Sequence, residues 1–443
     1  MGREVIPPLG LLKIAALPDK NGHEVKIFDG NLIAETKIKK EILKRNPEFI
    51  GITTFTGPIL KGALEISRFA KENTEAKVIW GGVHASLLPF QVINEDCVDI
   101  VVLREGDYTL NEIIENKNNL EKVRGIIYKE HSKIYNTGDR GLIEDIDQLP
   151  LTPWHLIDAT KYIASWGDAK RTLPLITSRG CPYRCAFCYN TEFNKRKWRN
   201  YSTENICREL DYLISNYPID GVRIMADNFI GLNRNKSIEI SECINKRGLL
   251  WSCLLRVDQT NRNILETYKK NGCTYIFYGI ESGSPRILSL IQKDITLEQV
   301  KRIIGITKEL KIRHAAGFMY DFPTETYKDL KATLELIDDL DTYVMLSAFQ
   351  PYPGNSLFNY CLEHSLIEFP KKTTGWTVFD YSKVHGLSSI PKDNLKELSQ
   401  RLNSRYNYYH NIKVASTKGD ITMLASMGGH VLESFTRNLN QFG

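Results

Sequence analysis

The sequence predicts an α/β protein with two successive β/α domains and a mainly helical C-terminal tail. Two series of short apolar runs alternate with amphipathic stretches at helical spacing, which is the pattern of parallel sheets covered by helices. A proline-bearing connector without periodicity separates the two series. The chain of 443 residues is also too long for one ordinary compact domain. We therefore expect domains over residues 1–137 and 173–360, a linker over 138–172 and a helical region over 361–443.

The first domain is predicted to be a doubly wound, Rossmann-like sheet. Its strand candidates are the apolar runs His23–Asp29, Phe49–Thr54, Lys77–Gly81 and Asp99–Arg104, and Gly125–Asn136 resembles a hairpin. Such sheets bind ligands outside the carboxyl ends of their strands. The residues of interest at these ends are Thr54, Phe55, Gly81, Gly82, His84, Glu105 and Gly106.

The strand that normally opens such a sheet is not evident. Only Arg3–Ile6 stand before the turn Pro7-Pro8-Leu9-Gly10, where a first, usually central strand is expected. Either this strand is a stub, or the native start lies upstream, or the sheet is incomplete. The predicted fold therefore allows for a sheet that lacks its first strand.

The second domain is predicted to be a partial, TIM-like barrel of six β/α units. Its six apolar runs are Leu173–Ser178, Gly221–Ala226, Trp251–Val257, Thr274–Ile280, His314–Tyr320 and Tyr343–Phe349. Polar side chains gather at the carboxyl ends of these strands, where barrel enzymes place their chemistry. They include Asp227, Asn228, Arg256, Asp258, Glu281 and Ser282.

Composition and charge restrict the class of protein. Hydrophobic residues make up 42% and charged residues 25% of the chain, as in ordinary soluble domains. No run approaches the roughly 18 apolar residues of a membrane span, and no signal-peptide pattern is visible. The net charge of +5 is scattered rather than gathered in basic blocks. We expect a cytoplasmic protein without a membrane span or a nucleic-acid partner.

Three of the nine cysteines, Cys181, Cys185 and Cys188, lie within eight residues at the end of the first barrel strand. Three soft thiolates in one loop can bind three irons of a 4Fe–4S cubane and leave the fourth iron open. The alternative is a zinc site or structural thiols, but a zinc site usually shows a second pair of ligands, which is missing here. The pattern favours the cluster. Isolated cysteines such as Cys207 and Cys243 are expected to be buried thiols.

This loop, with Phe187 before its last cysteine, resembles the radical S-adenosylmethionine superfamily over about residues 171–355. The resemblance implies that the open iron binds S-adenosylmethionine and that reductive cleavage gives a 5′-deoxyadenosyl radical. A salt bridge at the barrel mouth is the alternative interpretation of the polar residues of the later strands. The residues that the resemblance assigns to S-adenosylmethionine are Phe187, Asp227, Asn228, Arg256, Glu281 and Ser282.

Several short sequence motifs are similar to those of the cobalamin-binding subgroup of that superfamily. Among them are Gly81-Gly82-Val83-His84 and Arg104-Glu105-Gly106-Asp107. The Asp-x-His-x-x-Gly motif that supplies a histidine to cobalt is absent, so cobalamin would bind without a lower histidine ligand. We expect His84 to be a loop hydrogen-bonder rather than a ligand. The alternative is a Rossmann-like domain that only supports the barrel. The residues that the resemblance assigns to cobalamin are Thr54, Phe55, Gly81, Gly82, His84, Glu105 and Gly106.

The resemblance implies a cobalamin-dependent radical enzyme, and we expect a methyltransferase that acts on an unactivated carbon of a small-molecule or natural-product substrate. A non-methylating enzyme of the anaerobic porphyrin cyclase type lies within the same resemblance. A tRNA methylthiotransferase would need three more cysteines in the first domain, where only Cys97 is present. The non-enzymatic alternative is an iron–sulfur or cobalamin sensor. The expected protein partner is a reducing donor such as flavodoxin or ferredoxin.

Overall fold

The computed structural model describes residues 5–380 and 383–397. They divide into two compact units. The first unit holds the residues up to Leu254 together with Glu266–Tyr275 and Gln350–Lys383. The second unit holds Leu255–Leu265, Ile276–Phe349 and the residues from Val384 onward.

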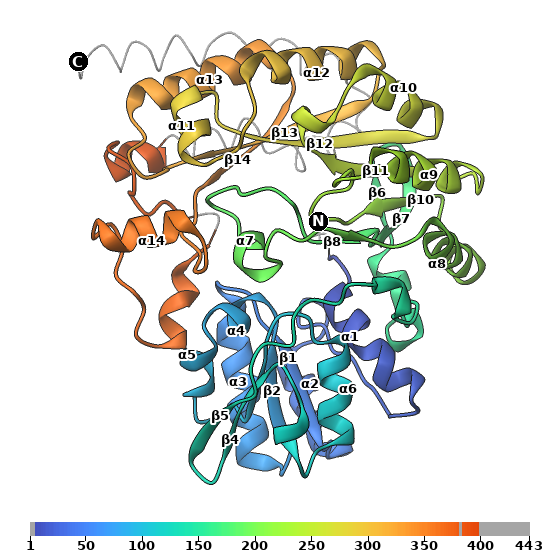
Figure 1. Cartoon of the computed structure of the whole chain (residues 1–443), viewed down its shortest axis with the longest axis vertical. Helices are drawn as coiled ribbons and strands as arrows, with labels where there is room; N and C mark the ends of the chain where they lie inside the picture. The colour runs from blue at the N-terminus through green and yellow to red at the C-terminus, as the bar shows by residue number, and fades with distance from the viewer. Residues whose placement is uncertain (1–4, 381–382, 398–443) are drawn as a thin grey trace. The chain divides into compact units, whose positions relative to one another are not determined.

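The N-terminal part of the first unit is built on a five-stranded sheet in the order β1-β2-β3-β4-β5. β1 (Phe49–Thr53), β2 (Lys77–Gly81) and β3 (Ile100–Val102) are parallel, whereas the hairpin of β4 (Ile126–Glu130) and β5 (Lys133–Asn136) continues the sheet antiparallel. Three predicted strands and the predicted hairpin are confirmed. The helices of this part, in blue to cyan in Figure 1, are α1 (Leu9–Lys20), α2 (Glu35–Arg45), α3 (Ile59–Asn73), α4 (Val83–Leu87), α5 (Pro89–Ile93) and α6 (Asp107–Glu115).

The run His23–Asp29 has no regular secondary structure and pairs with no strand, so the prediction of a strand there is wrong. β1 is the edge of the sheet, and no strand precedes it among the residues described from Val5 onward. In one common doubly wound order the opening strand lies between the second and the third. Without that strand the run has no neighbour to pair with. Ile27 packs instead in an apolar cluster with Leu12 of α1 and Trp154.

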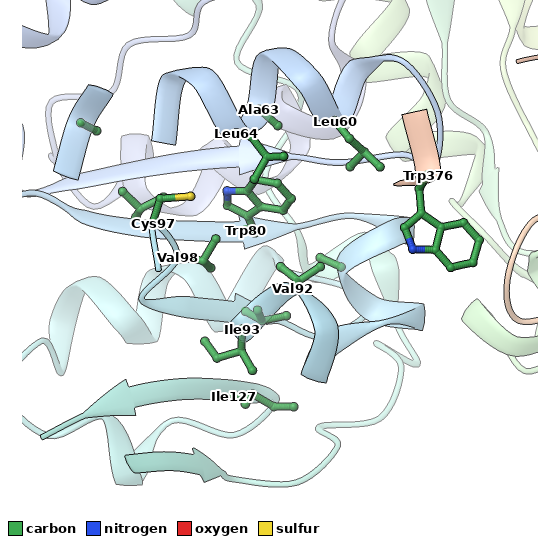
Figure 2. Packing of buried hydrophobic residues seen from close by; sticks show 14 of the residues in the cluster. Leu60, Ala63, Leu64, Trp80, Val92, Ile93, Cys97, Val98, Ile127 and Trp376 are labelled. Atoms are coloured by element: carbon green, nitrogen blue, oxygen red, sulfur yellow. The ribbon is translucent and has the colours of Figure 1, made fainter. Parts of the chain in front are cut away.

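Apolar side chains between the sheet and α3 form the core of this part. Trp80 of β2 is fully buried in a cluster with Leu60 and Leu64 of α3 (Figure 2). Its indole N–H donates a 2.8 Å hydrogen bond to Ser67 Oγ, which satisfies the polar atom of the ring. Trp376, which lies near Leu60 in Figure 2, is also fully buried in this cluster. The C-terminal segment of the first unit therefore contributes to the core of the N-terminal part.

A second sheet has seven strands in the order β14-β13-β12-β11-β10-β7-β6. The six strands predicted for the barrel are present as β7 (Ala169–Leu175), β10 (Gly221–Ile224), β11 (Leu250–Leu255), β12 (Cys273–Glu281), β13 (Arg313–Tyr320) and β14 (Tyr343–Ala348). β7, β10 and β11 are parallel neighbours, as are β13 and β14. The main helices between them are α8 (Thr203–Asn216), α9 (Arg234–Asn245), α10 (Arg262–Lys270), α11 (Pro285–Leu290), α12 (Leu297–Glu309) and α13 (Tyr327–Leu340). The predicted partial barrel is confirmed.

The beginning of this sheet differs from the prediction. β6 (Ala164–Trp166), inside the predicted linker, pairs antiparallel with β7. β7 ends at Leu175, and β8 (Ser178–Arg179) then pairs with β9 (Arg199–Asn200) in a separate ladder. The predicted strand Leu173–Ser178 therefore joins the end of β7 to the start of β8. An apolar run does not show where the backbone leaves a sheet.

Side-chain caps fix where the barrel helices begin. Ser202 accepts a backbone N–H of the first turn of α8. Thr296 and Thr326 form capping boxes at the starts of α12 and α13 with Gln299 and Asp329, respectively. Each such cap satisfies a backbone donor that has no partner within the helix and stabilises it by about 1 kcal/mol.

The predicted linker is not free of structure. It contains the short 3-10 helices η2 (Ile146–Gln148), η3 (Trp154–Leu156) and η4 (Ala159–Tyr162). Trp154 is buried, and its indole N–H donates to Glu209 of α8 at 2.9 Å. The segment is therefore packed against a barrel helix.

The described part of the C-terminal region is partly helical. It contains α14 (Ser356–Glu363), η6 (Thr373–Val378) and a helical stretch over residues 392–397. The remainder of the predicted helical tail lies outside the described residues. In residues 5–380 and 383–397, no helix has the length and apolar character that crossing a membrane requires.

A disulfide joins Cys207 of α8 to Cys243 of α9. The prediction of two buried thiols is wrong here, because a separation of 36 residues gives no sign that the two helices meet. Cys253, Cys273 and Cys361 are buried and lie outside this disulfide, as predicted.

Candidate active site

The three predicted cluster ligands share one loop between β8 and α7 (Asn190–Phe193). Gly180 shapes its first turn, with φ of +78° in the left-handed region. A side-chain carbon at this position would lie 2.0 Å from the carbonyl oxygen of Lys197. The chain therefore turns sharply just before Cys181.

The thiols of this loop lie in a partly desolvated environment. Cys185 is buried, and Cys181 and Cys188 are partly buried. Burial raises the pKa of Cys188 to about 12, and the nearby Cys185, Asp227 and Cys181 add to the rise. Such a thiol ionises when a bound metal replaces its proton, as in an iron–sulfur cluster. Among the described residues, no three His, Cys, Asp or Glu side chains form a group that could hold one metal ion.

Asp227 and Asn228, which follow β10, contact the cysteine loop. The Asp227 carboxylate accepts the backbone N–H of Gly180 at 2.9 Å. The Asn228 amide nitrogen lies 3.7 Å from the Cys181 sulfur. The Asn228 carbonyl accepts the indole N–H of Trp198 at 2.8 Å, which fixes the backbone there. The structure therefore brings both predicted residues to the first cysteine.

The far end of the loop is held by α14. The backbone N–H of Leu357 donates to Ala186 O at 3.1 Å, and the Asn355 amide donates to Phe187 O at 3.2 Å. Asn355 also caps α14 by accepting the N–H of Phe358 at 2.8 Å. Sequence reasoning did not single out Asn355, because asparagine before an apolar helical run is an ordinary N-cap pattern.

Residues that follow β3 hold the strand in front of the loop. Arg179 donates to the two oxygens of Asp107 at 2.9 Å each and to Glu105 at 3.2 Å. Glu105 also accepts from Arg199 of β9 at 2.7 Å and from the Ile143 N–H at 2.8 Å. Burial alone would raise the pKa of Asp107, but Arg179 holds it below its usual value. Glu105, predicted to contact cobalamin, thus belongs to a buried ion-pair network beside the cysteine loop.

Arg104 reaches the other side of the loop. Its guanidinium donates to Phe193 O, at the end of α7, at 2.6 Å. Its backbone N–H donates to Ser86 Oγ at 2.8 Å, and Ser86 Oγ in turn donates to Gly82 O at 2.7 Å. Arg104, Glu105 and Asp107 therefore hold both flanks of the cysteine loop, and we call these three residues the clamp.

In the second unit, Arg256 and Glu281 are joined through Lys293. Lys293 donates to Glu281 at 2.8 Å, and its backbone carbonyl accepts from Arg256, which also pairs with Asp258 at 2.9 Å. The salt-bridge interpretation of Arg256 and Glu281 therefore describes this structure. Sequence reasoning missed Lys293, because a lysine twelve residues after a glutamate carries no motif.

Ser282 is fully buried in a network with α13. Its hydroxyl is 3.1 Å from Thr333 Oγ1 and accepts the N–H of Ser284 at 3.1 Å. Glu325, in the loop after β13, is also fully buried. One carboxyl oxygen accepts the N–H of Asp321 at 2.7 Å, whereas the other has no partner among the described residues. Burial raises the pKa of Glu325 to about 8.

Comparison with known families accounts for both domains. Residues 3–114 match the model of the B12 binding domain, and residues 175–337 match that of the radical SAM superfamily. A protein of Pyrococcus horikoshii named as an uncharacterized methyltransferase is 32% identical over 413 residues, covering 90% of this chain and 87% of that protein. The chain belongs to the cobalamin-binding radical S-adenosylmethionine enzymes.

A further relative and a solved structure of similar fold carry the names of activities. The anaerobic magnesium-protoporphyrin IX monomethyl ester cyclase of Rubrivivax gelatinosus is 27% identical, covering 90% of this chain and 73% of its own. The structure of the radical S-adenosylmethionine methyltransferase TsrM of Kitasatospora setae, with cobalamin and a 4Fe–4S cluster bound, superposes with a TM-score of 0.67. It is 17% identical and matches 83% of this chain and 75% of its own, so it supports the fold.

Residues that this radical S-adenosylmethionine enzyme would use for cobalamin meet at the ends of β1 and β2. Thr54 Oγ1 donates to Gly81 O at 2.8 Å, and Thr54 O accepts the N–H of His84 at 3.1 Å. Gly82 has φ of +90°, and a side-chain carbon there would lie 2.8 Å from Thr54 O. Phe55 is 51% exposed beside them. The result is a closely packed backbone with an exposed aromatic ring, which suits a flat macrocycle.

His84 adds an unsatisfied polar atom to this region. Its Nδ1 is hydrogen-bonded with Thr56 Oγ1 at 2.9 Å, which is the loop hydrogen bond expected of it. Burial lowers the pKa of His84 to about 4, so its ring is neutral at pH 7. Its buried Nε2 has no partner among the described residues. Buried polar atoms are normally paired, so this nitrogen fits a cofactor group as its partner. Gly106, the remaining glycine predicted to contact cobalamin, lies at the start of α6. A side-chain carbon there would lie 3.4 Å from a side-chain carbon of Val102.

Proposed function

We propose that this enzyme is a methyltransferase that alkylates an unactivated carbon of a small-molecule substrate. When bound, the reduced cluster and S-adenosylmethionine supply a 5′-deoxyadenosyl radical, and cobalamin supplies the methyl group. The observation that carries the proposal is the three-cysteine loop, whose two flanks are bound by residues of the B12 binding domain. An enzyme that combines a radical with a methyl donor needs these two sites fixed to each other.

The residues around the loop have separate roles in this proposal. Cys181, Cys185 and Cys188 hold the cluster, and Phe187 packs against adenine. Asp227 orients the loop through the N–H of Gly180.

The polar groups of the barrel strands would bind the remainder of S-adenosylmethionine. Asn228 would bind the methionine amine, and Arg256 the carboxylate. Glu281 and Ser282 would meet the ribose. Lys293 and Asp258 hold Glu281 and Arg256 in place, so little side-chain freedom remains to be lost on binding.

The proposed cobalamin contacts are Thr54, Phe55, Gly81, Gly82 and His84, with Glu105 and Gly106 supporting the rim. His84 Nε2 would hydrogen-bond a polar group of the cofactor. The cofactor would bind without a lower histidine ligand.

The test is anaerobic reconstitution with dithionite and S-adenosylmethionine that carries a deuterated methyl group. The expected results are 5′-deoxyadenosine and a deuterated methyl group on cobalamin extracted from the enzyme. A sensor would give neither product. A ring-closing enzyme, which the cyclase relatives favour as the second candidate, would give 5′-deoxyadenosine but leave cobalamin unlabelled.

Cys185→Ala tests the loop itself. Loss of one of three thiolates leaves an iron without its ligand, so we expect cluster iron to fall to background and 5′-deoxyadenosine formation to stop. Cys97→Ala changes a buried free cysteine outside the loop and should keep wild-type iron content. Iron analysis and chromatography of the nucleoside measure the result. Wild-type iron and activity in Cys185→Ala would overturn the assignment.

Two finer expectations complete the proposal. A small electron carrier such as flavodoxin or ferredoxin would supply the electron, and the enzyme would work in the cytoplasm. Replacement of dithionite by reduced flavodoxin in the same assay tests the first.

A further inference from the structure

The clamp joins the two cofactor-binding parts of the first unit. Asp107 and Glu105 follow β3 of the B12 binding domain, and their partner Arg179 stands two residues before Cys181. The side chains of Glu105 and Asp107 are 5% and 3% exposed, respectively. Their bonds to Arg179 are therefore shielded from solvent and from screening by salt.

The geometry of the clamp restricts the loop more than a single ion pair would. The guanidinium of Arg179 is bound to Asp107 through two parallel bonds of 2.9 Å, which fixes its orientation as well as its distance. Glu105 ties Arg179 to Arg199, and these two arginines lie on the paired strands β8 and β9. The far flank is bound through Arg104 to Phe193.

We infer that Asp107 and Glu105 are positioning residues for the cluster loop, so that the B12 binding domain is needed for S-adenosylmethionine binding at the cluster even without cobalamin. The inference rests on the proposed function. The three thiolates bind the cluster from within one loop, so its assembly does not depend on the clamp. The path of the chain into the loop does depend on the clamp, because Asp107 and Glu105 bind Arg179 two residues before Cys181.

The test uses the full chain, reconstituted anaerobically without cobalamin. Asp107→Asn removes the charge and keeps the size. Its iron content should remain at the wild-type level, whereas the dissociation constant for S-adenosylmethionine should rise about tenfold, as for other groups that orient metal ligands. The change in the electron paramagnetic resonance spectrum of the reduced cluster on titration with S-adenosylmethionine measures this constant. Arg179→Lys keeps the charge but loses the paired bonds, and should give a smaller rise.

The matched control lies on the same helix. Glu112 of α6 makes a two-point contact with Arg140, remote in sequence from the cysteine loop, and Glu112→Gln should leave the dissociation constant within twofold of wild type. Wild-type affinity in both Asp107→Asn and Arg179→Lys would overturn the inference, as would an equal loss in Glu112→Gln. If Asp107→Asn does not fold, Arg179→Lys decides. If the wild-type spectrum does not respond to S-adenosylmethionine, the proposed function itself fails.

Discussion

His84 in the first unit and Glu325 in the second are two titratable side chains that are buried without charge after a strand. Each has one polar atom without a partner among the described residues. Burial favours the neutral form of both, which lowers the pKa of His84 to about 4 and raises that of Glu325 to about 8. The same physical cause therefore makes the two units respond to pH in opposite directions.

Two optical signals weight the two units differently. All six tryptophans belong to the first unit, so intrinsic fluorescence reports its unfolding, whereas far-ultraviolet circular dichroism reports both. The tryptophans are Trp80, Trp154, Trp166, Trp198, Trp251 and Trp376.

The largest effect is expected for Glu325→Gln. In wild type the unfolded carboxyl ionises near pH 4.5 and the folded one near pH 8. The stability of the second unit is thus full below pH 4.5 and falls as pH rises to 8, by on the order of 5 kcal/mol. Glutamine does not titrate, so this fall should disappear. Urea unfolding followed by circular dichroism between pH 4.5 and 8.5 measures it, and an unchanged pH dependence would refute the assignment.

A smaller effect of opposite sign is expected for His84→Gln. The unfolded imidazole titrates near pH 6.5 and the folded one near pH 4. The stability of the first unit is therefore full above pH 6.5 and falls as pH drops to 4, by on the order of 3 kcal/mol. The variant should lose this acid sensitivity. Tryptophan fluorescence is the probe, since the rings of His84 and Trp376 are 5.9 Å apart. A variant as acid-sensitive as wild type would contradict the prediction.

The smallest effect is expected for Asn355→Ala, which changes no titratable group. Loss of the α14 cap should cost about 1 kcal/mol, equally at pH 5 and pH 8. Urea unfolding at the two pH values, followed by fluorescence, measures this loss. A loss that depends on pH would show that the first unit contains another pH-sensitive group near α14.

Much of the fold could be predicted because parallel strands are marked by local apolar runs. The six barrel strands are marked in this way. The cysteine loop is marked instead by the spacing of its three cysteines. β6 was not recognised, because Ala164–Trp166 is too short to show a period. His23–Asp29 has the right composition for a strand, yet pairing depends on a neighbour that the run itself cannot specify. Local sequence thus identifies a strand former and not its partner.

The candidate site was predicted where its residues are close in sequence. Cys181 was predicted as a site residue, as were Asp227 and Asn228 after β10. In the structure both of these residues contact the cysteine loop. The ion pair of Arg179 with Asp107 was not predicted, although Arg179 stands two residues before Cys181, because 72 residues separate the two partners. The burial of Glu325 could not be predicted either, since nothing in one sequence distinguishes a buried glutamate from an exposed one.

The bare edge of β1 has a practical consequence. In the described part of the chain, β2 pairs with one side of this strand and nothing pairs with the other, and Gly51 at its centre is exposed. An uncovered strand edge attracts other extended chains, with which it can form intermolecular ladders. Concentrated preparations should therefore self-associate through this edge, and a lysine placed at Gly51 should keep them monodisperse.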